Sequence, residues 1–280
     1  MNITNVGASR IGAHAHRYLF TKSRQGTVLS LFQHGFNVLF DEDSDVGFVP
    51  FQSVSVPLHP WAIELPDLAG IPAVGAPSTV EGDCIRFDDE LSIAMGDAEI
   101  CELRIQPWRQ DEAVSAQRRV LKIKDSYAAK LTESYPGSIS RQSREDLIRE
   151  TGKTLEAILH ELVGSGRGST PSGDDFLVGS LAVLWATRTF SLHADRQIKG
   201  FRVLCRWEKL VERTPLPSAQ MILAATEGSF AEPIQVFLAT IIGEEDELIA
   251  DATATLVAQG ATSGIDVLSG ILAALRSIDH

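Results

Sequence analysis

One stretch of sixteen residues constrains the fold of this chain more than any other. It runs from Gly164 to Gly179 with the sequence GSGRGSTPSGDDFLVG. Glycine at every second position of its first part allows positive φ angles and lets backbone N–H groups approach a ligand closely. An apolar segment typical of a helix follows directly, and the unpaired N–H groups of a helix N-terminus favour negative charge. The stretch therefore predicts an anion-binding loop at the start of a helix.

Half of this stretch occurs a second time. Segment 172–179, SGDDFLVG, aligns without a gap with segment 263–270, SGIDVLSG, 91 positions later. That separation is too long for a short solenoid repeat and fits a pseudo-twofold arrangement better. Glycine inside a helix costs about 1 kcal/mol relative to alanine. We therefore expect two loop-to-helix corners that face each other, with Gly179 and Gly270 at a close helix–helix contact.

The pattern of apolar residues changes near residue 108. Before it, segments 27–32 and 36–40 flank a short turn and predict a hairpin, and alternation at 53–56 and 101–105 predicts half-buried strands. After it, apolar residues follow helical spacing. The sequence predicts an α+β fold with a β-rich domain, 1–108, and a helical domain, 109–280.

Helices are expected at several places in the second half. Apolar spacing at 120–131 and at 147–162 predicts two of them, separated by Tyr135-Pro136-Gly137, with Ser143 and Asp146 as an N-terminal box. After the glycine loop and its helix, further helices are predicted over 194–212, 218–227, 233–242 and 245–258, and the second motif copy opens the last helix.

Charge and cysteine content limit the partners. The net charge of −12 and the absence of a basic run argue against a nucleic-acid surface. Three scattered cysteines favour a reducing, cytoplasmic location without a disulfide framework. The longest apolar run, 176–186, is too short to span a membrane. A small anionic substrate remains compatible with an acidic chain, because a local loop can bind it.

The motif residues allow a functional and a structural interpretation. Asp174 and Asp175 could hold a divalent cation that bridges phosphate oxygens, or accept hydrogen bonds from an amide. Arg167 could bind a carboxylate or phosphate, or point to solvent. No lysine precedes a serine or threonine here, so the loop is not a nucleoside-triphosphate P-loop. In the structural interpretation, Ser172 with Asp175 and Ser263 with Asp266 are capping boxes that only start two helices. Asp174 has no acidic counterpart in the second copy, so we expect it to carry the chemistry.

At these residues the chain resembles the AllH-like family, which includes a subunit of oxamate carbamoyltransferase. Segment 166–175, GRGSTPSGDD, is similar to the family pattern GxGLTPSGDD, with Ser169 at the usual leucine. Segment 260–266, GATSGID, is similar to GHTSGxD, with Ala261 at the histidine. The region around Asn37 is also similar, with His34 at an arginine position.

The resemblance implies carbamoyl transfer between oxamate and phosphate in purine catabolism, with oxalurate and carbamoyl phosphate as the paired species. It implies co-encoded enzyme subunits as partners and leaves a homo-oligomer and a divalent cation open. Asp174 and Asp175 are the expected catalytic residues. The expected substrate-binding residues are Asn37, Gly166, Arg167, Gly168, Thr170, Ser172, Gly173, Thr262, Ser263, Gly264 and Asp266. The alternative is a non-catalytic binding or assembly subunit whose two motifs are structural helix corners.

Overall fold

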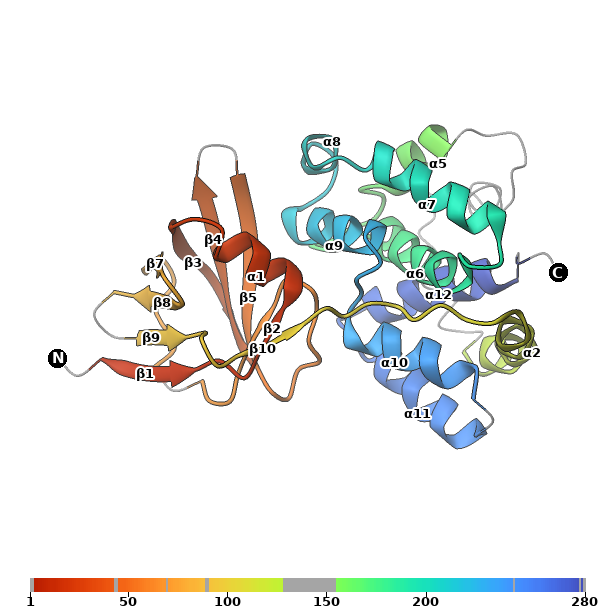
Figure 1. The fold of residues 1–280 in the computed structure, drawn as a ribbon, viewed down its shortest axis with the longest axis horizontal. Coiled ribbons are helices and arrows are strands. Elements are labelled where there is room, and N and C mark those ends of the chain that lie inside the picture. The colour runs from red at the N-terminus through yellow and green to blue at the C-terminus, as the bar shows by residue number, and fades with distance from the viewer. Residues whose placement is uncertain are drawn as a thin grey trace. The chain divides into compact units, whose positions relative to one another are not determined.

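The chain folds into two units of different secondary structure (Figure 1). A computed structural model describes residues 3–42, 45–68, 70–88, 91–127, 155–243, 245–276 and 278. The first unit, residues 1–103, is built from strands, and the second, 104–280, from helices. This confirms the predicted α+β class. The predicted domain boundary at residue 108 stays a prediction.

Within its described residues, the first unit forms one mixed sheet of ten strands in the order β1-β9-β8-β7-β3-β4-β5-β6-β2-β10. The strands are β1 (Thr4–Gly7), β2 (Arg10–Gly12), β3 (Arg24–Phe32), β4 (Gly35–Glu42), β5 (Asp45–Ser53), β6 (Ile63–Leu65), β7 (Pro77–Glu81), β8 (Cys84–Phe87), β9 (Leu91–Ala94) and β10 (Glu99–Cys101). A short helix, α1 (Ala13–Leu19), packs its apolar side chains into the core of this sheet. The centre of that core is aromatic, because Phe36 stacks on Phe51 at a centroid distance of 4.9 Å and both meet the edge of Phe87.

The strand predictions were partly right. The hairpin is confirmed, because β3 and β4 pair antiparallel with Phe32 opposite Gly35. The strand expected at 53–56 is wrong: Val56 N donates to Ser53 O at 2.9 Å, which closes a turn. The strand expected at 101–105 ends at Cys101, because Leu103 has a φ of +51° that a strand does not allow. Helix α1 was not predicted, since seven residues give too short a periodic pattern.

The second unit contains α2 (Gln110–Ser126), α5 (Leu155–Leu162), α6 (Ser172–Thr187), α7 (Leu192–Leu204), α8 (Trp207–Val211), α9 (Leu216–Thr226), α10 (Glu232–Ile241), α11 (Asp246–Val257) and α12 (Ser263–Leu275). Helices α6 and α12 run through the middle of this unit, and the others surround them (Figure 1). Both central helices are buried along nearly their whole length. The unit therefore has one apolar core, built around the two motif helices.

The helix predictions agree with most of these elements. The segment expected at 194–212 is two helices instead, because the backbone leaves the helical conformation at Cys205, with a ψ of 73°. Gly228 and Gly260, expected at helix C-termini, have φ angles of +86° and +60° and follow α9 and α11. The expectations for 128–154, including the turn at 135–137 and the box of Ser143 with Asp146, lie outside the described residues.

Among the helices that the structure describes, none combines the length and the apolar character needed to cross a membrane.

Candidate functional site

The two motif copies form equivalent corners that meet. Helix α6 begins at Ser172 and α12 begins at Ser263, as predicted. A Cβ atom on Gly179 would lie 2.1 Å from the carbonyl oxygen of Val267, and one on Gly270 would lie 2.0 Å from that of Phe176. The two contacts join equivalent positions, because Gly270 and Val267 lie 91 positions after Gly179 and Phe176. The expected pseudo-twofold contact between the motif helices is therefore confirmed, with the two backbones touching.

The capping-box interpretation is wrong by one position. The N-cap residues are Pro171 and Thr262, neither of which makes a side-chain capping hydrogen bond, and the motif serines are the first helical residues. The backbone closes each corner instead: Gly173 N donates to Ser165 O at 2.8 Å, and Gly264 N donates to Gln259 O at 2.9 Å. Because the helices start at the serines, Asp175 and Asp266 lie beyond the N3 position that a box requires.

The glycine loop has the predicted left-handed backbone. The φ angles of Gly164, Gly166 and Gly168 are +77°, +125° and +97°. A Cβ atom on Gly164 would also lie 2.0 Å from Arg213 O, and one on Gly166 would lie 2.6 Å from Ser172 N. Glycine is therefore required at both positions, by φ and by close approach. Residues 166–169, including Arg167, are exposed.

Asp174 connects the loop to the following helices. Its Oδ1 atom accepts a hydrogen bond from Gly164 N at 2.8 Å, and its Oδ2 atom accepts from Ser218 Oγ at 2.5 Å and from Thr214 Oγ1. The side chain is 1% exposed, and burial raises its pKa while these three donors lower it. Both carboxylate oxygens that a substrate or cation would need are thus engaged by the chain itself.

Asp175 lies in a different environment, between the two corners. Thr170 Oγ1 and Ser263 Oγ are 2.7 Å apart, so the loop of the first copy touches the first turn of the second. Burial raises the pKa of Asp175 to about 8, hydrogen bonds from Ser263 and Thr170 lower it, and the charges of Asp266 and Asp174 raise it. Its Oδ2 atom is buried and has no hydrogen-bond partner among the described residues. The raised pKa favours the protonated form of Asp175, in which the carboxyl group can donate a hydrogen bond.

The position of this group suits a negative ligand. The N-termini of α6 and α12 converge here, and each helix adds about half a positive charge at that end. Two hydroxyl groups and one carboxyl lie at this point; the hydroxyl groups now bond to each other and to Asp175, and a ligand would have to exchange with these bonds. Among the described residues, no three His, Cys, Asp or Glu side chains form a metal-binding group, so a cation held by Asp175 and Asp266 would need other ligands.

The structure thus brings together part of the predicted site. Thr170, Asp175, Ser263 and Asp266 meet at the junction of the corners. The other predicted residues of the helical unit lie in the exposed loop or the adjoining turns: Gly166, Arg167, Gly168, Ser172, Gly173, Thr262 and Gly264. Asn37 belongs to strand β4 of the first unit, where its side chain donates to Ser30 Oγ at 2.9 Å. The roles proposed for these residues stay predictions.

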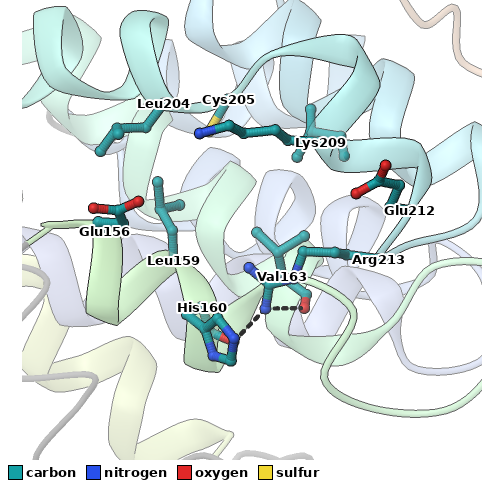
Figure 2. A pocket seen from close by; sticks show the side chains of 10 residues that line it. Glu156, Leu159, His160, Val163, Leu204, Cys205, Lys209, Glu212 and Arg213 are labelled. Carbon is teal, nitrogen blue, oxygen red and sulfur yellow. Dashed lines mark hydrogen bonds between the residues drawn. The ribbon is translucent and has the colours of Figure 1, made fainter.

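Two contacts around the loop were not predicted. Thr214 and Ser218 hold Asp174, and Arg213 donates to the carbonyl oxygens of His160 and Val163 at the end of α5 (Figure 2). The sequence signal for the first contact was a carboxylate in an apolar helix start, which must find donors elsewhere. Arg213 also lines a cavity of about 300 Å³ between α5 and the α7–α8 segment, with an apolar floor that includes Leu159 and a rim of charged side chains (Figure 2).

The described residues form a β-rich unit followed in the chain by a helical unit with two paired loop-to-helix corners. Residues 162–275, which contain both corners, match the family model described as oxamate carbamoyltransferase subunit AllH. The match supports an AllH-like assignment for the segment that carries the motifs. Searches of curated proteins and of solved structures found no match.

Proposed function

We propose that this chain is an AllH-like subunit of a carbamoyltransferase-type enzyme and binds a small anionic substrate where the two corners meet. The observation that carries the proposal is the 2.7 Å contact between Thr170 Oγ1 and Ser263 Oγ. It brings two motif copies, 91 positions apart, to one point beside Asp175, inside the segment that the AllH model matches.

The chemistry follows from the proton on Asp175. In phosphorolysis of oxalurate, a phosphate oxygen attacks the carbamoyl carbon, and the bond from that carbon to the amide nitrogen breaks. The nitrogen leaves with the electron pair and needs a proton, which Asp175 can supply as a general acid with a pKa of about 8. The products are carbamoyl phosphate and oxamate. The helix N-termini and hydroxyl groups stabilise the charge that develops on the carbonyl oxygen.

Asp174 receives a structural role in this proposal. Its two oxygens accept three hydrogen bonds from the chain, so it fixes the loop that presents Thr170. The same observation favours the second candidate function, a non-catalytic binding or assembly subunit. In that case the corners would only join helices, and Asp175 would not enter a reaction.

Calorimetric titration with carbamoyl phosphate tests the binding site. Thr170→Val keeps the side-chain shape and removes one hydroxyl, and we expect the affinity to fall about tenfold, because a hydrogen bond to a charged group contributes about 1.5 kcal/mol or more. Thr255→Val is the matched control, because that threonine is exposed on α11 and donates only to its own helix, at Asp251 O. Equal affinity of the two variants would refute the site.

Turnover separates the two candidate functions. The chain would be mixed with its co-encoded subunits and assayed for oxalurate phosphorolysis, with Asp175→Asn in parallel. The general-acid role predicts that Asp175→Asn still binds the anion while turnover falls at least a hundredfold. Wild-type turnover in this variant would contradict that role. Anion binding without turnover in any mixture would favour the binding subunit.

A further inference from the structure

A second group of hydrogen-bond donors lies at the opposite end of α6. The indole ring of Trp185 is half-buried there, and the Cζ atoms of Arg188 and Arg202 lie 4.7 Å and 5.8 Å from its centroid. Gly228, with a φ of +86°, packs against the ring, since a Cβ atom on it would lie 2.9 Å from the indole. The ring is thus fixed in place, with the half-buried Arg188 and the exposed Arg202 over it.

The charges in this group are of one sign. The causes that lower the pKa of Arg188 are burial and then the nearby guanidinium of Arg104. Within the described residues, neither Arg188 nor Arg202 forms an ion pair with a carboxylate. Other basic side chains of the same unit do, as in the pair of Lys199 with Asp195. Arg188 and Arg202 thus lie at one ring without a carboxylate partner, in a chain with 37 acidic and 25 basic residues.

The hydrogen-bond donors around Trp185 also outnumber the acceptors that the described residues offer them. A guanidinium has five N–H groups, and Arg188 directs one nitrogen to the carbonyl oxygen of Trp185. The Nε1 atom of Trp185 is buried and has no acceptor among the described residues. The remaining N–H groups of the two guanidinium groups suit a ligand that brings negative oxygen atoms, because guanidinium groups bind carboxylate and phosphate through paired hydrogen bonds.

We propose that Arg188, Arg202 and Trp185, with Arg104 beside them, bind a small dianion, either a phosphate compound or a dicarboxylate. The site is independent of the proposed carbamoyl transfer. It lies roughly 20 Å along α6 from the paired corners, at a rise of about 1.5 Å per residue.

The competing explanation is purely structural. Arg104 Nη1 donates to Glu227 O at 3.3 Å, and Arg188 donates to Trp185 O, so both guanidinium groups lie at the C-termini of α9 and α6. Cations stabilise such helix ends without any ligand. If Arg104 and Arg188 only stabilise helix ends, substituting them would lower the stability of the chain and leave its affinity for anions unchanged. Arg202 has no carbonyl contact of this kind among the described residues, so it separates the two explanations.

The test is a titration of the full chain with methyl phosphate, and separately with malonate, at mildly alkaline pH, where both are dianions, and at constant ionic strength, followed by tryptophan fluorescence. We expect a saturable change that disappears in Trp185→Phe. Arg202→Gln should weaken binding about tenfold, as for a lost hydrogen bond to a charged group. The matched control is Arg206→Gln, which removes the same charge from an exposed arginine near Glu208. The tighter probe of the two identifies the class of dianion.

Three outcomes would overturn the proposal. They are no saturable response to either probe, a response that persists in Trp185→Phe, and equal affinity of Arg202→Gln and Arg206→Gln. A Gly168→Val variant keeps this test separate from the paired corners. It should lose carbamoyl phosphate binding at the loop and keep the Trp185 response.

Discussion

The close contact between α6 and α12 predicts that adding one methyl group at Gly179 lowers the free energy of unfolding substantially. In Gly179→Ala, the new Cβ atom would lie 2.1 Å from Val267 O, and real Cβ atoms essentially never approach other atoms within 3.0 Å. Because the atom in contact is backbone, the helices must separate by about 1 Å. Such a gap forfeits a quarter to a half of the dispersion energy across the contact. We expect a cost of about 3 kcal/mol, of which better helix propensity returns about 1 kcal/mol.

Gly200→Ala is the matched control. This glycine lies inside α7, and its Cβ atom would meet Leu155 Cδ2 at 2.6 Å. That atom is the end of a flexible side chain, which can rotate away, so the gain in propensity should offset the contact. The stability of this variant should stay close to that of the wild type. The same substitution should therefore destabilise the chain at Gly179 and leave its stability nearly unchanged at Gly200.

Urea denaturation measures the difference. Trp108, Trp185 and Trp207 report on the helical unit, and Trp61 reports on the first unit. With a slope of about 2 kcal/mol per molar urea, the midpoint of Gly179→Ala should fall about 1 M below that of Gly200→Ala. Adding Gly270→Ala to Gly179→Ala should cost less than the sum of the two, because both act on one contact. Equal midpoints for the two single variants would refute the reasoning.

Two further predictions concern the motif aspartates. The pKa of Asp175 is higher in the folded chain than its ordinary 3.8, so the folded state holds a proton that the unfolded state loses, and stability should fall as the pH rises from about 4 to 8. Thermal melts over this range should show less decline in Asp175→Asn; a parallel decline would contradict the raised pKa. Asp174→Ala leaves buried donors of Gly164, Thr214 and Ser218 without their acceptor, so urea melts should show a loss of about 3 kcal/mol. The half-exposed Asp195→Ala should change stability by less than about 1 kcal/mol, and equal losses would show that the network contributes little.

Local sequence patterns predicted many of the helices and strands. They did not predict contacts between residues far apart in the sequence. The hairpin at β3 and β4 and the starts of α6 and α12 follow from short-range signals in the sequence. The partners of Asp174 could not be predicted, because Thr214 and Ser218 lie 40 and 44 positions away. The capping boxes failed because serine followed three residues later by aspartate fits more than one helix start.

The sequence predicted the region of the candidate site. It did not predict that Asp174 and Asp175 lie in different surroundings. The sequence singled out Asp174 because the second copy lacks it. The two environments differ in space: Asp174 is surrounded by donors, whereas Asp175 faces Thr170, Ser263 and the charge of Asp266. The roles of both aspartates stay predictions. Such differences depend on three-dimensional packing, which the spacing of residues in one sequence does not encode.

The contact between Thr170 and Ser263 also has a consequence for folding. These residues are 93 positions apart, and the glycine crossing of α6 and α12 joins segments almost as distant. Contacts of such long range slow folding, because a large loop must close before they form. During synthesis the glycine loop emerges long before α12, so the paired corners can assemble only after the last described helix has been made. Until then the exposed backbone of Gly179 lacks its partner surface, and the newly made helices are exposed to aggregation.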